Sequence, residues 1–286
     1  MNAVAPAPGI GQHAAMDALE LRAARRDATA LQPALERIVR RAARMVADGQ
    51  ARLRPRDVRR KGEGDFVTAV DVRVERWLRP QLTRLCPAAG FLGEESAPAE
   101  LDRPWLWVVD PIDGTSNFAN GLPHFAVSAA LLYRGAPLLA AVHCFPENRL
   151  YSARAGAGAR CQGRRMRIPA GRLDDGAILG CQWFRGQQDL AFVARLQRCG
   201  ARIRTLGSTV TQLADVATGR LHANVQEQGR TWDFAAAGLL VLEAGGCFTT
   251  WSGAPVFPFA HLDIGHTATV AASPAIHARV LRLLEG

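Results

Sequence analysis

The chain has 286 residues, of which 48% are hydrophobic and 21% are charged, a composition typical of a soluble globular enzyme with one large or two small domains. No apolar run approaches the roughly 18 residues that span a bilayer. The first twenty residues also lack the basic start and the apolar stretch of a secretory signal. We therefore expect a cytoplasmic protein without a membrane partner.

The formal net charge of +9 raises the question of a nucleic-acid partner. Lys61 is the single lysine, so nearly all the positive charge comes from arginine, which indicates a codon bias more than a designed basic face. No aromatic residues alternate with the arginine clusters as a stacking platform would require. We therefore favour solvated arginines, which can help to attract an anionic substrate, over a nucleic-acid partner.

The six cysteines contain no Cys-x-x-Cys pair, so neither a zinc site nor a disulfide framework is expected.

The N-terminal half predicts two helices followed by strands. Residues 1–30 are interpreted as a flexible N-terminal extension, a tail or a loosely docked helix. Apolar residues at helical spacing predict a helix over 31–49, and a basic, glycine-containing loop is expected over 52–64. A second helix is predicted over 72–85, with a kink at Pro80.

The rest of the chain predicts an α/β fold without a domain break, so residues 31–286 are expected to form a single catalytic domain. Strands are predicted over 105–110, 125–132 and 138–142, the last two joined by a turn at 134–137. The glycine-rich stretch 153–163 indicates tight turns between further strands. Helices are predicted over 233–244 and 274–284.

The densest chemical motif is Asp110-Pro-Ile-Asp113-Gly114-Thr115, directly after an apolar strand. Two carboxylates three residues apart on a sharp turn can converge on one Mg²⁺, which prefers oxygen ligands. Gly114 allows a close turn past a ligand, and amides at the start of a following helix would attract an anion. The alternative is an ordinary Asp-Pro and Asp-Gly turn, which this hexapeptide alone would favour.

Three further acidic motifs accompany the hexapeptide. Gly93-Glu94-Glu95-Ser96 follows a short apolar run, Asp71 ends the segment Asp65-Phe-Val-Thr-Ala-Val-Asp71, and Trp232-Asp233 opens a predicted helix. Each has a structural alternative, because Asp71 and Asp233 stand where helix N-caps belong and the glutamates could lie in a solvated loop. The combination decides between the two interpretations.

The four blocks together resemble the inositol monophosphatase family. D-x-V-T-x-x-D, G-E-E-S, W-x-V-D-P-I-D-G-T-x-N-F and W-D-x-A-A-x…E-A-G-G occur in that family's order, over roughly residue 31 to the C-terminus. The resemblance implies a layered αβαβα sandwich of the inositol monophosphatase and fructose-1,6-bisphosphatase type. It also implies a homodimer and lithium-sensitive hydrolysis of a small phosphomonoester.

The resemblance also implies the role of each residue. Glu94, Asp110 and the Ile112 carbonyl would hold a first Mg²⁺; Asp110, Asp113 and Asp233 would hold a second; and Glu94 and Asp71 would lie near a third, weaker one. Asp71 and the Thr115 hydroxyl would together take a proton from the metal-bound water. The substrate would contact Asp113, Gly114, Thr115, Gly207, Ser208, Thr209 and Glu227.

The chemistry of phosphate hydrolysis is consistent with these roles. A dianionic phosphomonoester repels hydroxide, and a pair of bound metal ions both neutralises charge and generates a nucleophile near neutral pH. No covalent-aspartate signature is present, which favours direct attack by a metal-activated water.

Substrate choice rests on a position where the chain departs from the family. Relatives carry a glutamate seven residues before the aspartate of W-D, but here that position is Gln226. Glu227-Gln-Gly restores the E-x-G pattern one residue nearer Asp233.

The preferred prediction is hydrolysis of myo-inositol 1-phosphate. The same chemistry on histidinol phosphate, fructose 1,6-bisphosphate, a nucleotide 3′-phosphate or another sugar phosphate is the alternative. A regulatory protein that binds RNA or a transcription complex is a third interpretation. The intact carboxylates argue against a purely binding role, and an added binding role beside the catalytic one stays an alternative.

Overall fold

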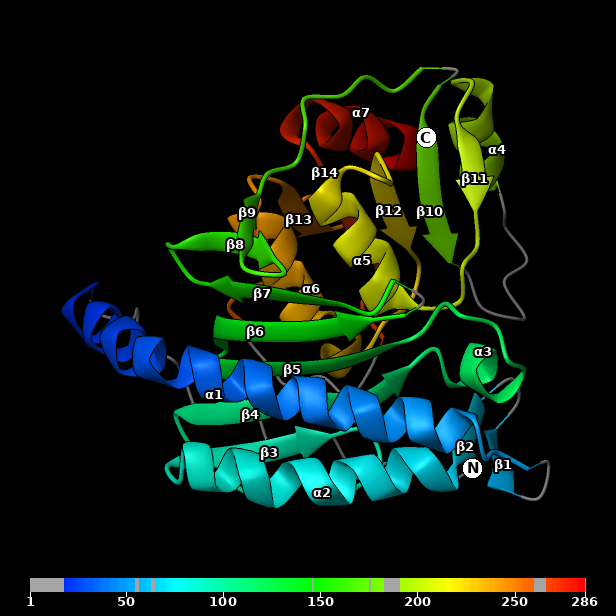
Figure 1. Cartoon of the computed structure of the whole chain (residues 1–286). Coiled ribbons are helices and arrows are strands. Elements are labelled where there is room, and N and C mark those ends of the chain that lie inside the picture. Colours follow the sequence, from blue (N-terminus) through cyan, green and yellow to red (C-terminus); the bar gives the residue numbers. More distant parts are fainter. Residues whose placement is uncertain are drawn as a thin grey trace, which may run out of the picture.

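Two long amphipathic helices form one outer layer of the protein (Figure 1). The computed structural model describes residues 18–54, 57–62, 65–145, 147–174, 176–182, 191–259 and 266–285. Helices α1 (Ala18–Gln50) and α2 (Ala69–Leu85) lie side by side against one face of a large sheet. Leu35, Val39 and Val46 of α1 are fully buried with Val74 and Leu78 of α2, so both helices turn an apolar stripe to the sheet.

The large sheet has seven strands in the order β3-β4-β5-β6-β7-β8-β9. Strands β3 and β4 are parallel and every later pair is antiparallel. The bounds are β3 (Ala89–Gly93), β4 (Trp105–Asp113), β5 (Ala126–Tyr133), β6 (Ala136–Cys144), β7 (Arg149–Arg154), β8 (Gly158–Cys161) and β9 (Arg164–Met166). The short helix α3 (Thr115–Ala119) follows β4 directly.

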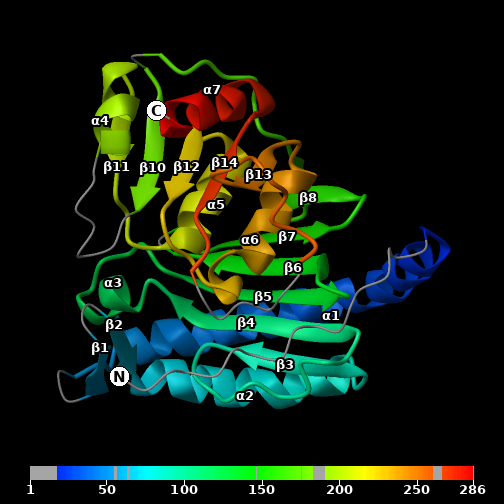
Figure 2. The same cartoon turned by 180° about the vertical axis from the view of Figure 1, so that it is seen from behind.

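A second helical layer separates the large sheet from a five-stranded one (Figures 1 and 2). Helices α5 (Thr209–Thr218) and α6 (Thr231–Glu243) pack against each other and contact both sheets. The second sheet has the order β11-β10-β12-β14-β13, and its outer face is covered by α4 (Ala191–Arg198) and α7 (Pro274–Glu285). Its strands are β10 (Ile178–Gln182), β11 (Arg202–Arg204), β12 (Ala223–Gln226), β13 (Cys247–Thr250) and β14 (Thr269–Ala272).

The layers therefore follow the predicted order αβαβα, which confirms the expected fold class. Three apolar clusters fill the interfaces between layers: one between α1, α2 and the large sheet, one around α5 and α6 that reaches both sheets, and one beneath α4 and α7. Burial of apolar surface in these three clusters is the main favourable contribution to folding.

The first helix differs from the prediction, because it begins before residue 31. Residues 18–30 continue the same helix, and Ala24 (4% exposed) and Ala28 (0% exposed) are buried one turn apart. The segment is rich in alanine and arginine, which have high helix propensity. The part of the expected flexible extension that the structure describes is thus a packed helix, while residues 1–17 lie outside the described ranges.

Two further boundaries differ from the prediction. Helix α2 begins at Ala69, three residues before the predicted start, because Thr68 and Asp71 form a capping box, and the helix continues through Pro80 to Leu85. The basic segment expected as a loop contains strand β1 (Val58–Gly62), which pairs with β2 (Asp65–Thr68). The predicted strands before and after the 134–137 turn are present as β5 and β6, joined by residues with positive φ at Arg134 and Gly135.

All six cysteines are free thiols, and two of them, Cys144 and Cys181, are buried. Among the described helices, none combines the length and the apolar character that a membrane span requires.

Ala28 provides a test of the packing of residues 18–30. An Ala28→Glu substitution would place a carboxylate at a fully buried site, so we expect it to cost about 3 kcal/mol or more of stability. Ala30→Glu, on the exposed side of the same helix, is the matched control and should change stability little. Equal unfolding midpoints in urea for the two variants would show that this part of α1 is not packed.

His143 predicts a loss of stability in acid. Burial, helped by the charge of Arg40, lowers the pKa of His143 to about 4, below its ordinary value of 6.5. The unfolded chain therefore takes up this proton first, and stability is lost as the pH falls from 6.5 towards 4. In His143→Phe, which cannot titrate, we expect the loss of unfolding free energy between pH 7 and pH 5 to shrink by about 1–2 kcal/mol. An unchanged loss in the variant would contradict the prediction.

Candidate functional site

The Asp110–Thr115 turn lies at the carboxyl end of β4, in the middle of the fold. Leu106 and Val108 face the cluster around α5 and α6, whereas Trp107 and Val109 face α1 and α2. Strand alternation therefore directs Asp110 towards α6. The pairing of β4 with β5 is irregular between Asp110 and Asp113, which allows both carboxylates to lie on the same side.

Gly114 is required by the backbone of this turn. Its φ is 90°, a left-handed conformation, and a Cβ at this position would lie 2.9 Å from the His124 carbonyl oxygen. The helix α3 begins at the next residue, Thr115. The sharp turn expected from the sequence is present, and a helix begins directly after it.

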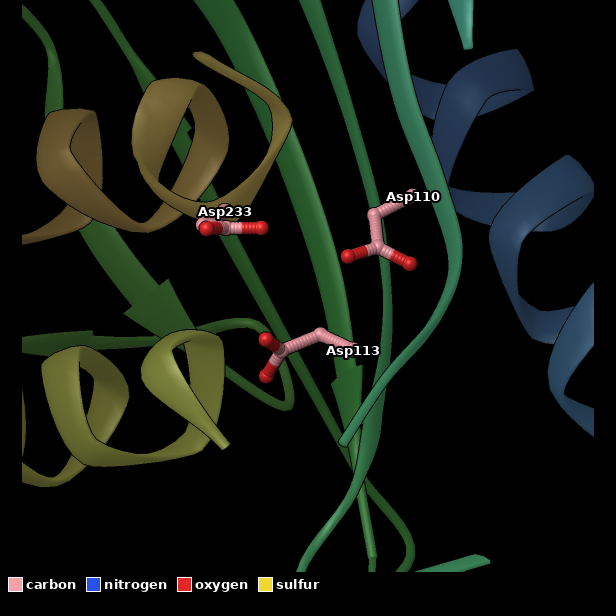
Figure 3. Close-up of side chains that lie close together, drawn as sticks. All are labelled: Asp110, Asp113 and Asp233. Carbon is pink, nitrogen blue, oxygen red and sulfur yellow. The ribbon is translucent and has the colours of Figure 1, made fainter. Parts of the chain in front are cut away.

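Asp110, Asp113 and Asp233 point towards one another (Figure 3). One carboxylate oxygen from each lies within 4.8 Å of the others. Asp233 comes from the first turn of α6, where its Oδ2 accepts a hydrogen bond of 2.7 Å from the Arg230 amide. Residues more than a hundred positions apart in the sequence thus form one acidic cluster.

The electrostatics of this cluster fit a bound cation. Burial raises the pKa of Asp110 well above its usual value, and the charges that raise it further belong to carboxylates: Glu94, Asp113, Asp233 and Asp71. Burial also raises the pKa of Asp113 to about 7, against the opposing effect of its hydrogen bonds. Carboxylate oxygens are the donors that hard divalent cations prefer, and a cation here would offset the mutual repulsion.

Glu94 lies beside the cluster, one residue after β3. Because β3 runs parallel to β4 with Gly93 opposite Val109, Glu94 and Asp110 come at neighbouring strand ends. Glu94 is half-buried, and its charge is the largest of the carboxylate effects on Asp110. Its oxygens are outside the group of three that meet within 4.8 Å.

Asp71 and Thr115, 44 residues apart, meet as the sequence predicts. The Thr115 hydroxyl lies 3.1 Å from Asp71 Oδ1 and 2.9 Å from the Ile112 carbonyl oxygen, so its one proton has two acceptors. Asp71 Oδ2 accepts hydrogen bonds from the amide and hydroxyl of Thr68, which fix the carboxylate at the start of α2. Burial raises the pKa of Asp71, and these hydrogen bonds oppose that effect.

The predicted substrate segment at residues 207–209 contacts the acidic cluster directly. The Ser208 hydroxyl donates to Asp113, and the amides of Thr209 and Val210 lie 3.3 Å and 2.9 Å from its oxygens. The segment is also tied to the residues after the turn, because Asn117 Nδ2 donates to the Leu206 carbonyl at 2.7 Å. Gly207 leaves no room for a side chain here, since a Cβ would lie 2.9 Å from Asn117 Nδ2.

Gln226 and Glu227 occupy different environments at the end of β12. Gln226 is buried, and its Oε1 accepts a 3.0 Å hydrogen bond from the Thr209 hydroxyl. Glu227 is half-buried, its amide donates to the Gln182 carbonyl at 3.1 Å, and its charge contributes to raising the pKa of Cys181. Strand alternation places Gln226, not Glu227, on the side of β12 that faces α5.

Glu75 on α2 is a buried acid near the site that lies outside the four acidic motifs of the sequence. The available signal was its spacing from Asp71, because residues four apart share one face of a helix.

Comparisons with known proteins agree on the family. The model of the inositol monophosphatase family matches residues 27–286. An inositol-1-monophosphatase of Rhizobium meliloti is 38% identical over 199 residues, which cover 68% of this chain and 75% of that protein. The Nus factor SuhB of Escherichia coli K12 is 36% identical over 223 residues, 76% of this chain and 84% of that protein.

A solved structure supports the same assignment. The IMPase of Thermotoga maritima superposes with a TM-score of 0.77 at 28% identity, covering 87% of this chain and 94% of that chain. Together with the family match over most of the chain, this shows that the protein belongs to the inositol monophosphatase family and is a phosphoric monoester hydrolase.

Proposed function

We propose that the protein hydrolyses a small phosphomonoester in a Mg²⁺-dependent reaction, with myo-inositol 1-phosphate as the preferred substrate. The observation that carries this proposal is the cluster of Asp110, Asp113 and Asp233, whose oxygens converge within 4.8 Å. Such a cluster is costly to bury without a counter-ion, and it has the donor chemistry that Mg²⁺ requires.

In the proposed site, Glu94, Asp110 and the Ile112 carbonyl would hold one Mg²⁺, and Asp110, Asp113 and Asp233 would hold a second. Glu94 and Asp71 would lie near a third, weaker one. Bound in this way, the metal supplies positive charge to the phosphate and lowers the pKa of water.

Asp71 and Thr115 are the proposed proton acceptors. The hydroxyl of Thr115 can pass its proton to Asp71 Oδ1 at 3.1 Å while it receives one from an attacking water. Thr68 holds the Asp71 carboxylate in this orientation through two hydrogen bonds to Oδ2. The backbone at Gly114 and Thr115, which opens α3, would bind phosphate oxygens.

The leaving group of the substrate would lie near Gly207, Ser208, Thr209 and Glu227. The other substrates weighed from the sequence, from histidinol phosphate to nucleotide 3′-phosphates, differ in this group alone. The homodimer that the family resemblance implies is part of the same proposal.

Chelation and one substitution test the proposed function. We expect hydrolysis of myo-inositol 1-phosphate to vanish in EDTA, to return with Mg²⁺ and to be inhibited by Li⁺.

Asp110→Asn should lower kcat by several orders of magnitude, because Asp110 is assigned to both metals. Asp102→Asn, at an exposed aspartate, is the matched control and should retain activity. Full activity after exhaustive chelation would refute the metal mechanism. If another monoester in a panel of substrates gave a higher kcat/KM than myo-inositol 1-phosphate, that monoester would be the preferred substrate.

Glu227 is predicted to recognise hydroxyls of the substrate. Glu227→Ala should lower kcat/KM for the preferred polyol phosphate about tenfold or more, the scale of a lost charged hydrogen bond of roughly 1.5–3 kcal/mol. Hydrolysis of p-nitrophenyl phosphate, whose leaving group has no hydroxyls to recognise, should change little.

Gln226→Ala is the comparison variant for this prediction. If it has the selective effect and Glu227→Ala does not, the residue that faces α5 determines specificity. An equal response of both substrates to Glu227→Ala would assign Glu227 a structural role.

A further inference from the structure

Glu75 is a buried carboxylate that the proposed reaction does not use. It lies one helical turn after Asp71 on α2, and only 2% of its surface is exposed. Its neighbours on the helix, Val74 and Leu78, are fully buried apolar residues of the core beneath the large sheet. A charged group at such a position is costly unless a specific interaction needs it.

The Glu75 carboxylate contacts the loop that carries Glu94. Oε2 accepts a hydrogen bond of 2.8 Å from the amide of Glu95. Gly93, on the other side of Glu94, packs against the same carboxylate: a Cβ on Gly93 would lie 2.8 Å from Oε1 and nearer still to Oε2. The backbone on both sides of Glu94 is therefore held by one buried side chain.

Glu94 needs such a restraint. Its carboxylate and that of Asp110 repel each other, as the raised pKa of Asp110 indicates. In the absence of a cation this repulsion favours movement of the loop away from β4. The hydrogen bond from the Glu95 amide to Glu75 Oε2 holds the loop against that repulsion.

We propose that Glu75 is a positioning residue that holds Glu94 ready for the divalent cation by accepting the hydrogen bond from the Glu95 amide. This inference rests on the proposed function, because it takes Glu94 to be a metal ligand. A restraint of this kind lowers the cost of ordering the loop when the cation binds, and so raises affinity for the cation.

The decisive experiment compares two replacements of Glu75. Glu75→Met fills a similar volume without a strong acceptor, and Glu75→Gln retains an acceptor oxygen without the charge. Mg²⁺ binding is measured by isothermal titration calorimetry and by the rise in Tm on adding Mg²⁺, and turnover is followed as a function of Mg²⁺ concentration. Val74→Ala, a core substitution at the adjacent position, controls for lower stability alone.

We expect Glu75→Met to weaken Mg²⁺ binding about tenfold and to raise the Mg²⁺ concentration for half-maximal rate by a similar factor. Its kcat at saturating Mg²⁺ should approach that of the wild type. Glu75→Gln should remain within about threefold of the wild type in Mg²⁺ affinity, and Val74→Ala should lower Tm without changing that affinity. Unchanged Mg²⁺ affinity in Glu75→Met, or equal loss in Glu75→Gln and Glu75→Met, would overturn the proposal.

Gly93→Ala provides an independent test if Glu75→Met does not fold. Its Cβ would displace the carboxylate from the Glu95 amide without altering the chemistry of either group. A folded Gly93→Ala protein with wild-type Mg²⁺ affinity would also overturn the proposal. If the wild-type protein itself neither binds Mg²⁺ nor requires it for turnover, the proposed function fails, and this inference fails with it.

Discussion

Repulsion among the carboxylates at the end of β4 is the constraint on which the arrangement of the site depends. Asp71 and Asp110 are almost completely buried, Asp113 is 7% exposed, and Asp233 and Glu94 are half-buried beside them. Burial alone disfavours each negative charge, and each neighbour disfavours it further. The fold must therefore supply favourable partners around these carboxylates. Without such partners, the carboxylates would become protonated or the chain would move them apart.

The first turns of three helices supply many of these partners. Asp71 is the N3 residue of α2, Asp233 is the N3 residue of α6, and Asp113 accepts hydrogen bonds from the first amides of α5. The amides at a helix start lack acceptors within the helix, and the helix dipole is positive there. The same groups therefore cap the helices and stabilise the acids. This explains why helices from two different layers begin at one end of β4.

These partners offset the cost of burying the carboxylates only in part. Amides and hydroxyls lower the pKa of Asp113, yet burial keeps it at about 7, and the pKa of Asp110 remains well above its usual value. Further neutral donors would satisfy the oxygens without removing the charge. A cation does both, so the arrangement favours metal binding over a merely structural network.

The sequence predicts those parts of the site that depend on neighbouring residues. An apolar strand followed by Asp110-Pro-Ile-Asp113-Gly114-Thr115 encodes a strand, a sharp turn and a helix start within one hexapeptide, and the structure has all three. The order of the acidic blocks, through the family resemblance, also implied that Asp71 meets Thr115. Local signals sufficed for the hexapeptide because it joins the end of a strand to the start of a helix.

The remaining features depend on packing that no local pattern encodes. Ser208 and Asp113 are 95 residues apart, and their hydrogen bond follows from the docking of α5 against the large sheet. The helical spacing of Asp71 and Glu75 shows that they share a face, but not that Gly93 and Glu95 lie opposite Glu75. The early start of α1 was missed because its buried residues there, Ala24 and Ala28, are small and carry a weak apolar signal.

Positive charge lies on the surface of the molecule, whereas the site gathers acidic residues. The formal net charge is +9 although several acids are gathered in the site. The outer layer exposes arginines along both of its helices: Arg22, Arg26, Arg37, Arg41 and Arg44 on α1, and Arg73, Arg76 and Arg84 on α2. An anion near this outer surface is therefore attracted, over a distance limited by screening to about 8 Å at physiological ionic strength. At short range the acidic cluster repels a phosphate unless its charge is neutralised. Under the proposed function, this short-range repulsion favours an order of binding in which the cation precedes the phosphate.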